Sequence, residues 1–285
     1  MADPSTEDTD SKVDLGSSFN DPTADVSYTS SDGVVFELHR KHIEVNAPNL
    51  PLPDVPSVND QDGSKNPPIA LQESAVVLDI LFRFVRASTK DKKTLPPSLS
   101  DIIGPVLFEV AEASEKYGVV GALNVCLIHM NQMVTDGRYP LEIVNFSDRH
   151  GYEALENAAA LLSLSYPYRD LVTKLSGSDL LRRFLLFRDE FANIRDTALS
   201  IMDKADCSSS GCQAIISLKL IYLSAVTENL ANARSSIPHT AAACVYDLRY
   251  ATSCKTMIYE KFSNLFDPEL SPVKVLSDIT LETTL

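Results

Sequence analysis

The chain has 285 residues, of which 44% are hydrophobic and 22% charged, a composition typical of a globular protein with about two domains. Its 39 acidic and 25 basic residues give a net charge of −14, which disfavours nucleic acid as a partner because phosphate contacts need clusters of lysine and arginine. No apolar run reaches the roughly 18 residues of a membrane-spanning helix, and the acidic N-terminus does not resemble a secretory signal, so we expect a cytoplasmic or nuclear protein without membrane partners.

Residues 1–24 are predicted to form a disordered acidic tail. They are rich in Ser, Thr, Asp and Pro, and only Val13, Leu15 and Phe19 are large apolar residues. So little apolar surface cannot offset the conformational entropy that folding removes. We therefore expect this tail to be dispensable for folding.

A small three-stranded sheet is predicted at the start of the folded part. Apolar and polar residues alternate over 26–29 and 34–38, on either side of a Ser-Asp-Gly turn, which predicts a β-hairpin. A short helix over 39–45 is expected to end at the proline-rich loop 46–53, because each proline removes a backbone donor and disfavours a helical residue before it. Residues 67–71 then predict a third short strand.

The remainder of the folded chain is predicted to be helical, since apolar residues recur at helical spacing from residue 73 onward. Gly104-Pro105 either kinks the helix that ends at Tyr117 or delays its start. In the longest helix before residue 203, four apolar residues are expected to face inward: Leu181, Phe184, Leu185 and Phe191. The predicted helices cover residues 73–86, 98–117, 119–133, 140–150, 153–164, 167–175, 178–202, 213–234 and 239–266, with 140–150 and 153–164 forming an αα-hairpin.

These elements predict an α+β protein, in which a small sheet covered by helices is followed by an all-helical C-terminal region. Four segments are expected: the disordered tail 1–24, a sheet-containing domain over 25–134, a helical extension over 135–266 and a C-terminal tail over 267–285.

The sequence contains none of the common catalytic or nucleotide-binding signatures, so we expect no enzymatic activity and no cofactor. Its five cysteines are expected to be reduced thiols, with Cys126 in the core. The four others are predicted to be structural and to bind no metal. The alternative is a metal-binding or enzymatic site assembled from the scattered Cys/His residues of the C-terminal helices: Cys207, Cys212, His239, Cys244 and Cys254.

Several segments, taken in order, resemble a BTB/POZ domain of a fungal, basidiomycete-type branch of that family. Residues 25–43, including the stretch Ser30-Ser-Asp-Gly-Val-Val-Phe-Glu-Leu-His39, are similar to the family's opening hairpin and first helix. The stretch Glu115-Lys-Tyr-Gly118 is similar to a later helix boundary, and residues 140–153 resemble the helical extension of the fungal proteins. The residues that carry the signature are Asp25, Phe36, His39, Lys116 and Tyr117.

The resemblance implies a non-enzymatic protein-interaction module, an adaptor or an oligomerising scaffold that binds a protein partner. It also implies a homodimer, with Tyr28, Ile43 and Val45 as the residues available for self-association, and a cullin-type ubiquitin-ligase scaffold as one class of partner. The chain departs from the family after the first helix, where a serine and a phenylalanine beside the dimer interface are usual. Here the proline-rich loop 46–53 takes their place.

Overall fold

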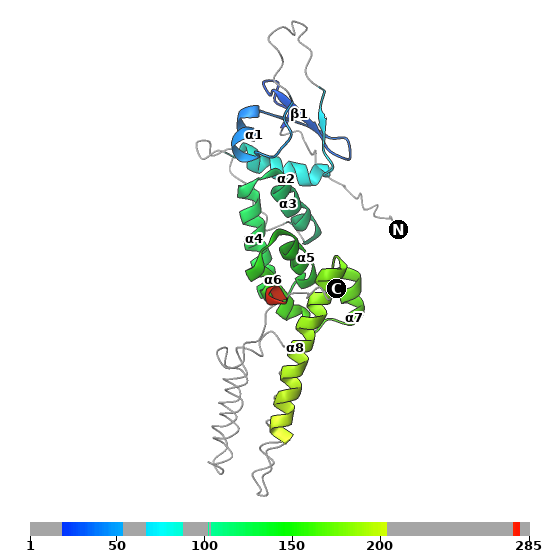
Figure 1. The fold of residues 1–285 in the computed structure, drawn as a ribbon. Helices are drawn as coiled ribbons and strands as arrows, with labels where there is room; N and C mark the ends of the chain where they lie inside the picture. Colours follow the sequence, from blue (N-terminus) through cyan, green and yellow to red (C-terminus); the bar gives the residue numbers. More distant parts are fainter. Residues whose placement is uncertain (1–18, 54–66, 88–101, 103, 204–275, 280–285) are drawn as a thin grey trace, which may run out of the picture. The chain divides into compact units, whose positions relative to one another are not determined.

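The computed structural model describes residues 19–53, 67–87, 102, 104–203 and 276–279 (Figure 1). The chain forms two compact units, residues 1–129 and residues 130–285, and each is considered by itself. The division falls within a helix. The predicted helices 213–234 and 239–266 lie outside the described residues, as does the segment 98–101.

The sheet of the first unit has three strands in the order β2-β1-β3. Strand β1 (Val26–Thr29) pairs antiparallel with β2 (Val35–Leu38), which confirms the predicted hairpin. Strand β3 (Ile69–Ala70) confirms the third strand and runs parallel to β1, with Tyr28 opposite Ile69. A parallel neighbour needs a long connection, which here includes helix α1 (Arg40–Asn46) and the proline-rich loop.

The helices among the described residues lie close to their predicted positions. Helix α3 begins at Gly104, so the Gly-Pro pair delays the start of this helix, in accord with the tolerance of proline in a first turn. The others are α2 (Ala75–Arg86) and α4 (Val120–Thr135), and then α5 (Pro140–His150), α6 (Glu153–Ser163), α7 (Tyr168–Lys174) and α8 (Ser178–Asp203). Three strands and eight α-helices in the described part make this a mainly helical α+β protein.

Four aromatic rings form the centre of the first unit. Phe82 of α2 packs against Phe36 and Tyr28 of the sheet, with ring centroids 5.4 and 5.5 Å apart. Phe19 lies 5.4 Å from Phe36 and is only 1% exposed. The prediction of a disordered tail through residue 24 is therefore wrong for residues 19–24, because Phe19 fills a place in the core that the local sequence does not reveal. Residues 1–18 lie outside the described part.

In the second unit, α5 and α6 pack against each other and confirm the predicted αα-hairpin (Figure 1). The first half of α8 buries Leu180, Phe184 and Phe187. Phe184 faces inward as predicted, whereas Leu181 and Leu185 are only half-buried, because the buried stripe follows Leu180, Phe184 and Phe187. The side chain of Phe191 lies outside the described residues.

A short 3₁₀ turn, η3 (Leu276–Asp278), packs on α6 and α8 within the second unit. Leu276 is fully buried, and Asn157 of α6 bonds Ser277 through both its amide oxygen and its amide nitrogen, each at 3.0 Å. The expected C-terminal tail 267–285 thus contains an ordered anchor. In the described part of the chain, no helix combines the length and the apolar character needed to cross a membrane.

Candidate functional site

The five signature residues all lie in the first unit, where the structure divides them among three places. Phe36 belongs to the aromatic core. Asp25 and His39 join the sheet to α1, whereas Lys116 and Tyr117 join the end of α3 to the residues before α2. They therefore form no single cluster.

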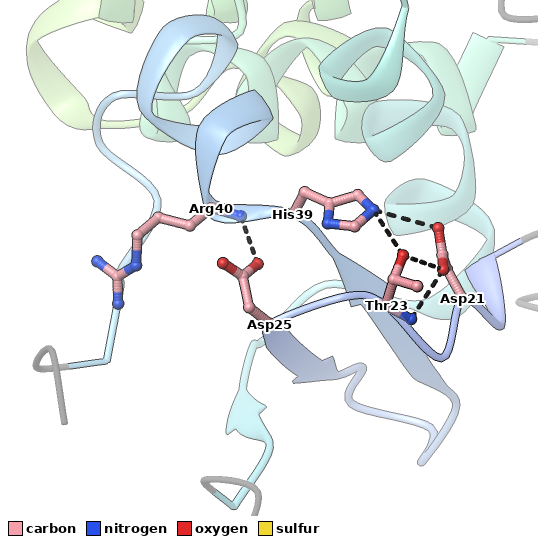
Figure 2. A network of polar contacts seen from close by, with 5 residues as sticks. All are labelled: Asp21, Thr23, Asp25, His39 and Arg40. Atoms are coloured by element: carbon pink, nitrogen blue, oxygen red, sulfur yellow. Dashed lines mark hydrogen bonds and ion pairs between the residues drawn. The ribbon is translucent and has the colours of Figure 1, made fainter. Parts of the chain in front are cut away.

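Asp25 caps the first turn of α1 (Figure 2). Its Oδ1 accepts a hydrogen bond of 2.7 Å from the backbone N–H of Arg40, the first residue of the helix. His39 occupies the N-cap position and makes no capping bond with its own side chain, so a carboxylate from the residue before β1 satisfies the free donor instead. Asp25 therefore fixes the angle at which α1 leaves the sheet.

His39 is held in a second polar contact, with Asp21 and Thr23 (Figure 2). Its Nε2 lies 3.2 Å from Oδ2 of Asp21 and 3.5 Å from Oγ1 of Thr23, while Thr23 donates a 2.7 Å bond to Oδ1 of Asp21. Two bonds from Thr23, assisted by His39, lower the pKa of Asp21 to about 2.

The Asp21–Thr23–His39 group contains the residue types of a nucleophilic triad but not its geometry. In a triad, one ring nitrogen of the histidine faces the hydroxyl and the other faces the carboxylate. Here a single nitrogen, Nε2, faces both. The group therefore serves as a clamp between the segment before β1 and helix α1, and it does not have the arrangement of a proton relay.

Lys116 and Tyr117 converge on Glu73, which precedes α2. Lys116 Nζ lies 2.8 Å from one carboxylate oxygen of Glu73, and the Tyr117 hydroxyl donates a 2.6 Å bond to the other. Burial acts to raise the pKa of Glu73, but these two donors outweigh it and hold that pKa below its usual value. Burial, together with the neighbouring carboxylate, raises the pKa of Tyr117 to about 12.

The proline-rich loop 46–53 is packed onto the first unit. The Tyr28 hydroxyl donates a 2.8 Å bond to the carbonyl of Pro51, and Arg40 donates one of 2.6 Å to the carbonyl of Pro53. Leu50 is buried, and the N–H of Asn49 bonds the carbonyl of Tyr117 at 3.2 Å. The loop is thus fastened both to the sheet side of the unit and to the end of α3.

The prediction of self-association is wrong for two of the three residues that it named. Tyr28 and Ile43 are 0% exposed within one copy of the chain, and Tyr28 packs on Phe82 of α2 and bonds Pro51 of the loop. They cannot contact a second copy while the unit is folded. Val45, the third, is 77% exposed on α1 and stays available.

Gly118, between α3 and α4, lies against the loop. Its φ of +72° lies in the left-handed region, and a Cβ there would meet Cγ of Pro48 and Nδ2 of Asn49 at 3.2 Å. Gly33, in the hairpin turn, has a similar φ of +85° but open space where its Cβ would be. Comparing a substitution at Gly118 with one at Gly33 therefore distinguishes the cost of backbone strain from the cost of disturbing the loop.

We expect Gly118→Ala to destabilise the protein more than Gly33→Ala. Both substitutions place a Cβ in the left-handed region, at a cost of about 1–2 kcal/mol, and only the first also displaces the loop. Urea unfolding followed by circular dichroism measures the difference. Equal losses in the two variants would show that the contact between the loop and Gly118 contributes nothing.

A second ionic cluster lies in the helical unit. Arg183 of α8 pairs with Asp148 of α5 and with Glu156 of α6, the latter at 3.5 Å. Glu156 is almost completely buried, and this burial raises its pKa despite the neighbouring guanidinium. The sequence did not reveal this cluster, because three separate helices supply its members and their spacing along the chain carries no pattern.

Helix α4 presents an uncharged surface. None of its 16 residues is Asp, Glu, Lys or Arg, although 22% of the whole chain is charged. Within the first unit, Val120 and Ile128 are 62% and 67% exposed, and Asn124 lies exposed between them. We call Val120, Asn124 and Ile128 the uncharged α4 face. Its signal, a 16-residue stretch without charge, is present in the sequence.

The described residues bring together no group of three His, Cys, Asp or Glu side chains that could hold a metal ion. The C-terminal candidates Cys207, Cys212, His239, Cys244 and Cys254 lie outside these residues. Cys126 is buried in α4, as predicted for a core residue, and burial raises the pKa of its thiol to about 12. A thiol with so high a pKa is a poor nucleophile at neutral pH.

Comparisons with models of known families, with curated proteins and with solved structures give no match to this chain.

Proposed function

We propose that this protein is a non-enzymatic interaction module, a scaffold or adaptor of the BTB/POZ type that binds other proteins and associates with itself. The observation that carries the proposal is the uncharged α4 face, which exposes two large aliphatic side chains on a helix without charged residues. Protein interfaces are depleted of charge at their centre, and a face without charge meets this requirement.

The rest of the first unit supports the same proposal. The polar side chains of the BTB-like signature are used to join structural elements: Asp25 to α1, His39 to Asp21, and Lys116 and Tyr117 to Glu73. Such bonds make a rigid support on which a binding surface can be displayed. The resemblance of residues 25–200 to the fungal BTB/POZ proteins implies the same role.

Self-association through the uncharged α4 face differs from the contact expected from Tyr28 and Ile43, which are buried. Two copies that each carry a net charge of −14 repel one another over most of their surfaces. A face without charge is where this repulsion is least costly at close approach. Ile128 lies on that face and is the residue whose substitution tests it.

We expect sedimentation equilibrium of the full chain to give a mass near 62 kDa, twice the 31.2 kDa of one chain. Ile128→Glu should weaken this association at least about tenfold, because it places a charge in the contact. Val172→Glu is the matched control, since Val172 is 60% exposed on α7 of the other unit.

A monomer that persists at concentrations up to about 100 μM, where a stable homodimer would form, would contradict the homodimer. Equal weakening by both glutamate variants would show that added charge opposes association wherever it is placed, and would remove α4 from the contact. Unchanged circular dichroism of both variants confirms that each remains folded.

A further inference from the structure

The segment Leu276–Ile279 is held on the second unit in the way that a protein holds a short peptide. It packs on α6 and α8 (Figure 1), and residues 204–275, which separate it from the end of α8, lie outside the described part of the chain. Its hydrogen-bond partner Asn157 is 120 positions away from Ser277 in the sequence. The contacts of this segment can therefore be treated as those of a ligand with its binding surface. We call the surface of α6 and α8 that it covers the Asn157 face.

Two aliphatic side chains anchor the segment. Leu276 is 0% exposed and Ile279 is 6% exposed, whereas Asp278 between them is exposed. The N–H of Ile279 donates a 3.2 Å bond to the carbonyl of Leu276, which closes a 3₁₀ turn. Because such a turn has three residues, side chains that are three positions apart lie on the same side of it, and the two anchors point the same way.

Asn157 of α6 recognises the residue after the first anchor. Its Oδ1 accepts a 3.0 Å bond from the N–H of Ser277, and its Nδ2 donates a 3.0 Å bond to the hydroxyl of the same residue. Only a residue with a hydroxyl at this position satisfies the acceptor and the donor of the asparagine amide together. Recognition of the segment therefore depends on three of its side chains, those of Leu276, Ser277 and Ile279.

This contact is small enough to open while the rest of the unit stays folded. Burying two aliphatic side chains and forming two hydrogen bonds yields a gain of the same order as the conformational entropy lost when four residues are ordered. Segments with so few buried contacts open at low cost in native proteins. The pair between Arg183 and Glu156 still joins α8 to α6 when the segment leaves, so the Asn157 face persists.

We propose that the Asn157 face is a peptide-binding site, which a partner protein occupies with a segment of the same chemistry after displacing Leu276–Ile279. That chemistry is a large aliphatic residue, a serine, any residue and a second large aliphatic residue, folded as one 3₁₀ turn. The chain's own segment competes with the partner and has the advantage of its tether. The site deepens the proposed function, on which it rests only for the existence of a partner. It shares no residue with the uncharged α4 face, so failure of one leaves the other standing.

Fluorescence anisotropy of a labelled synthetic peptide of residues 273–282, titrated with the full-length protein, tests the site. Leu276→Glu in the protein removes one anchor of its own segment and leaves the face free, so this variant should bind the peptide at least about tenfold more tightly than the wild type. Ile279→Glu should have the same effect, because it removes the other anchor. The matched control is Asp278→Ala, which changes an exposed residue of the same segment and should bind as the wild type does.

Adding Asn157→Leu to Leu276→Glu should weaken peptide binding about tenfold, because both hydrogen bonds are lost. Equal binding by the wild type and both glutamate variants would overturn the proposal, as would no binding at about 1 mM protein. Binding that is unaffected by Asn157→Leu would overturn it too. Circular dichroism reports whether the glutamate variants are folded, and loss of the folded state in both would show that the segment is an integral part of the core and does not exchange.

The chain offers a second test of the motif, since the same four residues occur in another context, as Leu99-Ser-Asp-Ile102. A peptide of residues 96–105 should bind the Leu276→Glu variant about as tightly as the peptide of residues 273–282. Replacing the serine of the 273–282 peptide with alanine should weaken binding about fivefold, through the loss of one hydrogen bond. A 96–105 peptide that does not bind would show that flanking residues determine recognition, and would overturn the four-residue motif.

Discussion

Replacing Arg183 with methionine is expected to lower the free energy of unfolding by about 3 kcal/mol, because it leaves the buried Glu156 carboxylate without its counter-ion. Asp148, which is one-third exposed, keeps part of its hydration and contributes less to the loss. The matched control is Arg182→Met, one residue earlier on α8, where the side chain is exposed and the loss should stay within about 0.5 kcal/mol.

The stability lost in Arg183→Met should depend on pH, and the direction of this dependence follows from the pKa of Glu156. Its pKa in the folded state is raised above the ordinary value of 4.5, so the folded state favours the protonated acid. The stability that this group contributes is present below pH 4.5 and is lost as the pH rises through the folded-state pKa. Removing Arg183 raises that pKa further. The free energy of unfolding of the variant should therefore lie farther below that of the wild type at pH 8 than at pH 5.

Urea unfolding at the two pH values, followed by circular dichroism, measures this effect. The double variant Arg183→Met, Glu156→Gln should recover more than half of the loss, because it removes the uncompensated charge together with its partner. If Arg183→Met proves no more costly than Arg182→Met, the cluster of α5, α6 and α8 has no role in stability.

The second large effect is expected at Phe82, the ring at the centre of the first unit. Phe82→Ala should cost about 3–5 kcal/mol, since it leaves a cavity lined by Phe19, Tyr28 and Phe36. This is a large share of the roughly 5–15 kcal/mol that stabilises a typical domain. Thermal or urea unfolding checks the value.

Two comparisons make the Phe82 result specific. Val76→Ala removes apolar atoms from the same helix at a site that is 40% exposed, and should cost less than about 1 kcal/mol. Phe19→Ala should cost more than Val76→Ala, because Phe19 belongs to the same aromatic cluster. A Phe19→Ala variant as stable as the wild type would show that residues 19–24 are dispensable, as the sequence suggested.

The candidate sites divide according to how far apart their residues lie in the sequence. The absence of charge from α4 can be seen in the sequence, because it is a property of one continuous stretch of the chain. The two ionic clusters cannot, since Glu73 and Lys116 are 43 residues apart and Asp148 and Arg183 are 35 apart. No spacing rule connects such positions before the chain folds.

The sequence by itself determined the secondary structure of the described part, from the hairpin at 26–38 to the helices through residue 203, because alternation, helical periodicity and Gly or Pro boundaries act over a few neighbouring residues. Only the tertiary structure decided that Phe19 is part of the core and that Tyr28 and Ile43 are enclosed and unable to form an interface. It also decided that β3 lies beside β1. These outcomes depend on which surfaces meet when distant segments pack, and a side chain of given polarity is buried or exposed according to that packing.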